Sequence, residues 1–413
     1  MRNPSGSLLT WVRARARERN SVVYGVLLLG ALLFPAIAQF VTNGDATPMI
    51  SQAADAGVYV LLAIGLNVVV GFAGLLDLGY AAFFAIGAYT AGMFASGQLG
   101  ASPLHHEIHI PFWLIIFLAM FFAASFGAML GAPTLRLRGD YLAIVTLGFG
   151  EIVPRIFRNM GFGSPLGNWT SGINGINAID RPTLPFWITG PWVNQPFQLV
   201  ANFDFGFDPM PFYVLMVILV VICVILVTNL QRSRLGRAWM AVREDEVAAA
   251  AMGVNTVTTK LLAFGIGAAF SGFAGAFYGT KLSLVGPEAF GFVVSVTVLV
   301  MVVLGGMGNI PGVIVGALLI YYVLYSFLGN LPDYLSNLAQ SVGLGFLNQP
   351  NYQHNWPGLH DEVLLLPFLI FGLILVSIML LRPQGLLPSR SRAQELRRHS
   401  DDTVVATAET IAR

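Results

Sequence analysis

The chain has 413 residues, of which 56% are hydrophobic and only 10% are charged, and its mean hydropathy is +0.72. Soluble proteins carry about 25% charged residues, so this composition excludes a soluble enzyme, a nucleic-acid-binding protein and a disordered chain. The net charge of +1 gives no overall attraction for acidic partners, and the single cysteine, Cys223, excludes an internal disulfide and a cysteine-based metal site. The composition is that of a polytopic membrane protein.

Continuous apolar runs predict an all-α polytopic integral membrane helix bundle of about ten transmembrane helices, because a helix needs about 20 apolar residues to cross the hydrocarbon core. The runs are uninterrupted rather than alternating, which disfavours a β-barrel. In chain order they cover residues 21–41, 52–71, 75–97, 112–133, 140–158, 211–230, 261–280, 290–306, 311–329 and 363–381.

The distribution of Lys and Arg predicts the orientation of the bundle. With the N-terminus in the cytoplasm and ten alternating spans, 18 of the 22 basic residues fall on the cytoplasmic side. This bias matches the excess of Lys and Arg that cytoplasmic loops carry, so both termini are expected inside. The predicted regions are a cytoplasmic basic tail (1–20), a transmembrane domain (21–382) with outside insertions (159–209 and 330–362) and a cytoplasmic loop (231–260), and a cytoplasmic tail (383–413).

The loop at 231–260 has the clearest local pattern. Glu244, Asp245 and Glu246 suit the positive end of a short helix, and Gly253 suits a left-handed C-cap. Positions i, i+3, i+4 and i+7 form an apolar stripe of Val247, Ala250, Ala251 and Val254. An alanine-rich face of this kind favours docking in a groove on another protein over lying on lipid, because lipid binding needs a larger apolar area.

The same loop resembles the cytoplasmic coupling loop of ABC importer permeases, whose pattern is Glu-Ala-Ala, three residues, Gly. Ala248, Ala249 and Gly253 hold that spacing, while Val247 occupies the glutamate position and Glu246 stands one place earlier. The resemblance implies that these residues couple the chain to an ATPase. The coupling set is Arg243, Glu244, Asp245, Glu246, Ala248, Ala249 and Gly253.

Longer stretches are similar to the branched-chain amino acid permeases of the LivM/LivH type. They cover roughly residues 55–390, and their order is closest to the LivM branch. The stretches are GLNVVVGFAGLLDLGYAAFFAIGAYTAG from Gly65, RGDYLAIVTLGFGEI from Arg138, REDEVAAAAMGVN from Arg243, KLLAFGIGAAFSGFAGAFYG from Lys260, VLGGMGNIPGVIVGALL from Val303 and LRPQGLLP from Leu381.

This resemblance implies the ABC importer permease architecture and a transport subunit of the bacterial inner membrane rather than an enzyme. It implies a sibling permease as heterodimer partner, two cytoplasmic ATPase subunits, a periplasmic substrate-binding protein and membrane lipid as partners, with no nucleic acid. Neither Lys260 nor Lys281 follows a GxxxxGK[ST] loop, so ATP is expected to be used by the partner subunits. The chain itself is expected to bind no cofactor and no metal.

Polar residues within or beside the spans are the candidates for the translocation path, because such groups are costly in a membrane and are functional by default. They are Asn67, Asp77, Tyr80, Thr146, Glu151 and Asn174. Glu151 is four residues before Arg155, so these two side chains are expected to pair on one helix face. Glycine-rich breaks near 71–79 and 305–312 fit either a transport path or close helix packing.

Some residues depart from the family pattern and leave the solute open. The family has Ser where Asp77 stands, His where Tyr80 stands, and Gly-Gly-Thr-Asn-Gly where Ser171-Gly172-Ile173-Asn174-Gly175 stands. A urea or short-amide ABC permease therefore remains an alternative.

An ion-coupled secondary amino acid transporter that uses Asp77 or Glu151 is a less favoured alternative, because it has no need of the alanine-rich cytoplasmic helix. An intramembrane enzyme is disfavoured, since all six histidines lie outside the predicted spans. The cluster of His105, His106 and His109 is expected to be a solvated loop rather than a metal site.

Overall fold

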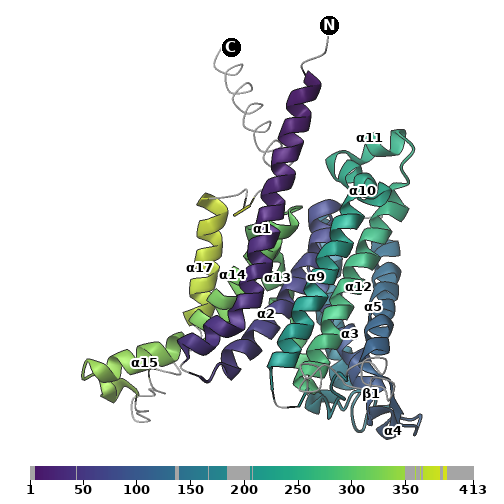
Figure 1. The fold of residues 1–413 in the computed structure, drawn as a ribbon. Coiled ribbons are helices and arrows are strands. Elements are labelled where there is room, and N and C mark those ends of the chain that lie inside the picture. Colours follow the sequence, from purple (N-terminus) through teal and green to yellow (C-terminus); the bar gives the residue numbers. More distant parts are fainter. Residues whose placement is uncertain are drawn as a thin grey trace, which may run out of the picture.

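The computed structural model describes residues 5–42, 44–134, 139–165, 167–183, 205–206, 208–348, 359, 363, 366–381 and 385–387. Several predicted features lie outside these residues: Arg136 and Arg138, the part of the first outside insertion from 184 to 204, and the tail beyond 387. The described residues form a helical bundle, as the apolar runs predict (Figure 1).

The long helices follow one another with short connections. They are α1 (Ser5–Val41), α2 (Thr47–Leu66), α3 (Tyr80–Phe94), α5 (Phe112–Thr134), α6 (Gly139–Asn159), α9 (Met210–Arg232), α10 (Arg234–Glu244), α12 (Thr256–Leu282), α13 (Phe292–Gly305), α14 (Ile310–Tyr321), α15 (Leu331–Ser341) and α17 (Leu366–Leu381). Short elements are the helices α4 (Gln98–Ala101) and α11 (Glu246–Ala251), the π-helices η1 (Asn67–Phe72) and η4 (Tyr322–Leu328), and the 3₁₀ turns η2 (Gly172–Asn174), η3 (Pro287–Phe290) and η5 (Gly345–Asn348).

Four two-residue strands are the only β-structure in the described part of the chain. β1 (Ala95–Ser96) pairs with β2 (Ile108–His109), and β3 (Ile176–Asn177) pairs with β4 (Leu284–Val285), both antiparallel. The second pair attaches the loop after α6 to the end of α12, and so closes that end of the bundle.

Seven of the described helical segments are long and apolar enough to cross a membrane. They are Val22–Val41, Thr47–Phe72, Phe112–Thr134, Met210–Arg232, Thr256–Leu282, Pro287–Gly305 and Ile310–Ser341. The sequence-based count of about ten also used α3, which has 15 residues, α6, which carries Glu151, Arg155 and Arg158, and α17, which has 16 residues. A multi-pass membrane protein is therefore confirmed, whereas the count of ten stays a prediction.

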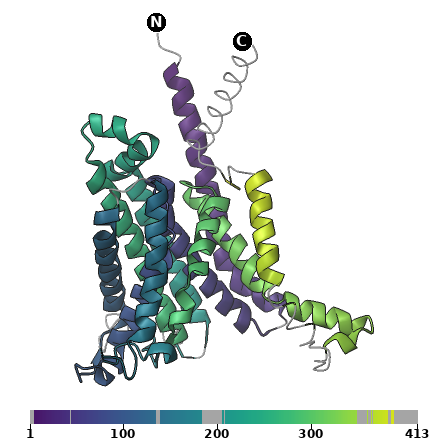
Figure 2. The ribbon, with the colours of Figure 1, turned by 180° about the vertical axis from the view of Figure 1, so that it is seen from behind.

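The two ends of the bundle differ in what they carry. α10 and α11 lie at the end beyond which the N-terminal part of α1 extends, whereas α4, β1 and α15 lie at the opposite end (Figures 1 and 2). The segment 385–387 lies at the α10 end too, because it bonds to the end of α13, next to the loop that contacts Gln231 of α9.

α12 lies at the centre of the bundle, where it packs against α2, α3 and α5. Small residues at the crossings let the helix backbones approach closely. A side chain at Gly87 of α3 would collide with the backbone of Gly272 on α12, and a Cβ at Gly272 would lie 2.6 Å from the Ala119 carbonyl of α5. The buried rings of Phe264 and Phe277, also on α12, fill the space beside these contacts.

Both glycine-rich breaks lie where helices end. η1 ends at Phe72 and α3 begins at Tyr80, and α13 and α14 are separated by a turn in which Gly306 has φ +113° and Gly308 has φ +81°. These left-handed values favour glycine. A side chain at Gly305 would collide with the backbone of α14, so close packing accounts for this glycine.

The LRPQGLLP motif has a structural role at the second break. The backbone N–H of Leu386 donates to the Leu304 carbonyl at 2.7 Å, and that of Leu387 donates to the Gly305 carbonyl at 3.2 Å. Asn309 Nδ2 donates to the Leu387 carbonyl at 2.7 Å. The segment after α17 thus satisfies the carbonyls that the end of α13 leaves unpaired, which explains why both motifs occur together.

Candidate functional site

The loop predicted to contain one short helix holds two helices, α10 and α11. Sequence analysis missed α10, because its first turns read as a basic stretch rather than an apolar pattern. Ser233 caps α10 by accepting a hydrogen bond from the Gly236 N–H at 3.3 Å. The Trp239 indole is completely buried and donates to the Thr259 carbonyl at 2.7 Å, which anchors α10 on α12.

α11 begins and ends as the sequence predicts. The Asp245 carboxylate accepts hydrogen bonds from the N–H groups of Val247 and Ala248, both at 2.9 Å, as an N-cap does. At the other end Gly253 has φ +86°, and its N–H donates to the Ala250 carbonyl at 3.0 Å. Together with the bond from the Val254 N–H to the Ala249 carbonyl, this is a Schellman C-cap.

The outer face of α11 is free of contacts with the rest of the described chain along most of its length. Val247 is 80% exposed and Met252 is 84% exposed, and the predicted stripe residues Ala250 and Ala251 are exposed too. Ala249 faces inward and is buried. Glu246 pairs with Lys260 of α12 at 2.6 Å, so α11 is held in place while its small-residue face stays open.

Arg243, at the end of α10, connects this segment with the first glycine-rich break. Its guanidinium donates to the carbonyl of Gly71 in η1. Its aliphatic stem lies against Gly74, where a Cβ would approach the Arg243 Cγ to 2.7 Å and where φ is +71°. A rigid contact therefore joins α10 to the end of the α2–η1 helix.

Asn67 joins the two glycine-rich breaks. Its side chain is completely buried at the start of η1, and its Oδ1 accepts a hydrogen bond from the Gly308 N–H at 2.8 Å. The Gly308 carbonyl in turn accepts from Gln231 Nε2 of α9 at 3.4 Å. π-Helical turns such as η1 often mark functional positions in helices.

Asp77 and Thr146 order the connection between η1 and α3. Asp77 is 1% exposed, so it does not face the cytoplasmic interface, and its Oδ1 accepts from the Gly79 N–H at 2.9 Å. Thr146 Oγ1 of α6 accepts from the Leu78 N–H at 3.1 Å. The two side chains satisfy backbone donors that a broken helix exposes inside the bundle.

Tyr80 crosslinks helices rather than opening onto a visible cavity. Its hydroxyl donates to the Gly267 carbonyl of α12 at 2.9 Å, and its own carbonyl accepts from Ser271 Oγ at 3.3 Å. The ring is buried against Phe83. Four candidate path residues, Asn67, Asp77, Tyr80 and Thr146, thus lie in or beside the first break.

Glu151 and Asn174 lie apart from that group. Glu151 forms the predicted pair with Arg155 at 3.3 Å, but the two side chains are 41% and 73% exposed. Asn174 is exposed in η2, next to the β3–β4 pair that follows α12. Because α12 begins beside α11 and runs the length of the bundle, Asn174 lies at the end opposite to α11.

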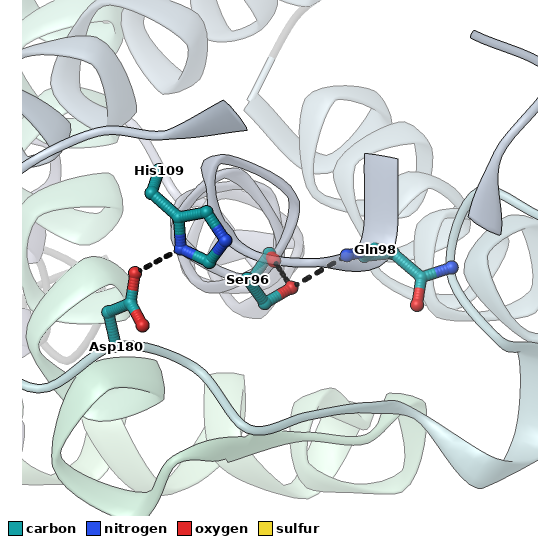
Figure 3. A network of polar contacts seen from close by, with 5 residues as sticks. Ser96, Gln98, His109 and Asp180 are labelled. Carbon is teal, nitrogen blue, oxygen red and sulfur yellow. Dashed lines mark hydrogen bonds and ion pairs between the residues drawn. The ribbon is translucent and has the colours of Figure 1, made fainter. Parts of the chain in front are cut away.

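The loops at that opposite end are held by a polar network (Figure 3). His109 Nδ1 and Asp180 Oδ2 are 2.5 Å apart, and the hydrogen bond with this carboxylate raises the pKa of His109. Ser96 Oγ accepts from the Gln98 N–H at 3.2 Å, and the Gln98 side chain accepts from Ser171 Oγ at 2.9 Å. Within the described ranges, no three His, Cys, Asp or Glu side chains gather as a metal site would need.

Sequence analysis missed an ion pair between Asp55 of α2 and Lys281 of α12. Lys281 Nζ lies 2.5 Å from Asp55 Oδ1 and donates to the Ser51 carbonyl at 2.8 Å, with only 6% of the lysine side chain exposed. The hydroxyls of Tyr59 and Tyr325 are hydrogen-bonded at 2.7 Å in the same region. The available signal was a carboxylate inside the run 52–71 and an ammonium at the end of another.

Comparison with known proteins assigns the family. Residues 49–345 match the family model described as the permease component of the branched-chain amino acid transport system. The high-affinity branched-chain amino acid transport system permease protein LivM of Salmonella typhimurium is 38% identical over 89% of this chain and 76% of its own length, and LivM of Escherichia coli shows the same identity and coverage. LivH of Salmonella typhimurium is 26% identical over 63% of this chain and 79% of its own. No solved structure matches the chain. The chain belongs to the family of branched-chain amino acid transport permeases.

Proposed function

We propose that the chain is the membrane-spanning permease subunit of an ATP-driven ABC importer that moves branched-chain amino acids across the bacterial inner membrane. The 38% identity to LivM over most of the chain carries this proposal. The relatives named above are permeases for branched-chain amino acids, which favours these solutes over urea or short amides. The ion-coupled alternative gains no support from Glu151, whose charge is compensated by exposed Arg155.

The ATPase is proposed to dock on α11. Its exposed alanine face offers a small, smooth surface, and the caps at Asp245 and Gly253 fix its length. An ATPase dimer that closes on ATP would carry α10 and α11 with it. The contacts of Trp239 and Glu246 with α12 would pass this motion to the centre of the bundle, and Arg243 would pass it to the first break.

The first break is the proposed moving part of the translocation path. Asn67, Asp77, Tyr80 and Thr146 hold the backbone there by hydrogen bonds, and breaking or reforming these bonds is a discrete two-state change. Alternating access requires such a change, because a ligand or partner shifts an equilibrium only between states with different contacts. Glu151 and Asn174 remain weaker path candidates, since both are exposed.

Orientation and partners follow from the same assignment. The end with α10 and α11 is proposed to face the cytoplasm and two ATPase subunits, with a sibling permease beside the chain in the membrane. The opposite end, with the His109–Asp180 network and α15, is proposed to receive the periplasmic binding protein. Cys223 is buried, so single cysteines at Thr256 and Ile173 report their own positions. Membrane-impermeant labelling of intact spheroplasts at Thr256 but not at Ile173 would reverse this orientation.

Reconstitution tests the function itself. Proteoliposomes with the chain, its sibling and the ATPases should take up leucine only with ATP inside and loaded binding protein outside. An ionophore that collapses proton and sodium gradients should leave this uptake unchanged, and excess urea or acetamide should not compete. Accumulation of leucine by the chain alone in response to an imposed ion gradient would instead support a secondary transporter.

A further inference from the structure

A cavity separates α1 from the rest of the bundle. It has a volume of about 1300 Å³ and lies between α1, α2, α9 and α14. Apolar side chains form most of its wall, whereas Tyr24 of α1 and Thr228, Asn229 and Arg232 of α9 lie together at one end. Its volume exceeds the 300–1,000 Å³ that is usual for pockets of small ligands.

The cavity exists because α1 is attached mainly near its C-terminal half. The Tyr213 hydroxyl donates to the Ala31 carbonyl at 2.6 Å, and the rings of Phe34 and Tyr213 lie 5.9 Å apart. Ala38 and Ile50 complete a small apolar cluster there. Only 11% of the apolar part of α1 is buried, so the helix leans on the bundle at this end and stands off towards its N-terminus.

The surroundings determine what fills such a cavity. Its walls belong to Val22–Val41, Thr47–Phe72, Met210–Arg232 and Ile310–Ser341, which are all membrane-spanning by length and composition. An empty apolar space loses dispersion contacts, and water there would lack hydrogen-bond partners along most of the wall. Acyl chains are the apolar material that surrounds these helices in a bilayer.

The polar end selects a headgroup. Arg232 is exposed at the last position of α9, and no acidic side chain in the described residues pairs with it. The Tyr24 hydroxyl and the Asn229 amide lie beside it as hydrogen-bond donors. The sequence of α1 adds four arginines between residues 13 and 19, ahead of its apolar run. Arginine and hydrogen-bond donors at the cytoplasmic membrane surface recognise lipid phosphates.

We propose that this cavity binds an anionic phospholipid, with its acyl chains between α1 and α9 and its phosphate at Arg232. The lipid joins α1 to the bundle directly beside Ser233, which caps the coupling helix α10. This site is independent of the transported solute, so it stands or falls separately from the proposed function.

Retention of lipid by the purified full-length chain tests the site. The delipidated protein is incubated with vesicles of phosphatidylglycerol or phosphatidylcholine, repurified, and its bound lipid is counted by native mass spectrometry. Wild type should retain phosphatidylglycerol preferentially. Arg232→Gln should lower this retention about fivefold, equivalent to about 1 kcal/mol, without changing that of phosphatidylcholine. The control Arg234→Gln removes a neighbouring exposed charge that does not line the cavity.

A pair of glycine variants tests the cavity separately from the charge. A Cβ at Gly30 or at Gly25 meets nothing within 4 Å, but only Gly30 lines the cavity. Gly30→Phe should therefore displace lipid, whereas Gly25→Phe should not. Equal lipid retention by Gly30→Phe and Gly25→Phe, or by Arg232→Gln and Arg234→Gln, would overturn the proposal.

A photocrosslinking amino acid at Gly30 in the assembled complex identifies the occupant. A lipid adduct is the expected product. An adduct with the sibling permease would also overturn the proposal, because a protein helix would then fill the space.

Discussion

Replacing Arg243 with methionine should uncouple ATP hydrolysis from transport. The guanidinium donates to the Gly71 carbonyl, and the stem packs on Gly74, so Arg243 is the direct contact between α10 and the broken helix. Methionine keeps the apolar stem and removes the charged donor. A hydrogen bond from a charged group contributes about 1.5–3 kcal/mol. Its loss would change the equilibrium between joined and separated states by about 10- to 150-fold.

The assay is leucine uptake per ATP hydrolysed in proteoliposomes that contain the whole complex. Arg243→Met should keep the basal ATPase rate and lose most of the uptake. Arg237→Met is the matched control, because Arg237 lies on the same helix but is exposed and bonds only locally, to the Arg232 carbonyl at 2.8 Å. If Arg243→Met transports as much leucine per ATP as Arg237→Met, motion does not pass through this contact.

Three further changes test the packing and the charges. Gly272→Leu should destabilise the chain by about 3 kcal/mol or more, because overpacking at a helix crossing forces backbones apart, and thermal unfolding in detergent should show little effect for Gly265→Leu, whose Cβ has space. Lys281→Met should cost about 3 kcal/mol in the same assay by leaving Asp55 unpaired, and Asp55→Leu in addition should restore stability. Hydrogen exchange of the Asp180 amide, corrected for its intrinsic rate, should be slower at pH 6 than at pH 8 in wild type only, not in His109→Asn.

The direction of that last effect follows from the pKa of His109. Its folded-state pKa is raised above the ordinary value of 6.5 by the hydrogen bond with Asp180. The pair is therefore fully stabilising below pH 6.5, and this stabilisation is lost as the pH rises through the raised pKa. Equal protection at both pH values, an undiminished Lys281→Met protein, or equal unfolding of Gly272→Leu and Gly265→Leu would each contradict the contact concerned.

Local patterns predicted the helical bundle and α11 well. Apolar runs set the membrane-spanning class, and the cap residues Asp245 and Gly253 define α11 because capping depends on neighbours within a few residues. The helix α3 begins later than the run 75–97 suggests, since residues up to Gly79 form the break instead. Apolarity alone does not distinguish a helix from a buried connection.

Contacts between distant residues were beyond sequence reasoning. Asn67 bonds to Gly308, and Asp55 pairs with Lys281, across more than half of the chain. A single carboxylate within an apolar run gives no sign of its partner. Tyr80 was predicted as a path residue, but its hydrogen bond to the Gly267 carbonyl depends on how α3 crosses α12.

Site-specific photocrosslinking from α11 tests the central claim most directly. A photoreactive amino acid at Ala250, which is exposed on the face proposed for docking, should capture the ATPase subunit in the assembled complex. The same group at Ile173, which is 71% exposed at the opposite end, should capture the binding protein and not the ATPase. Capture of the binding protein or only lipid at Ala250, with the ATPase captured at Ile173 or nowhere, would contradict the assignment of α11 as the coupling helix.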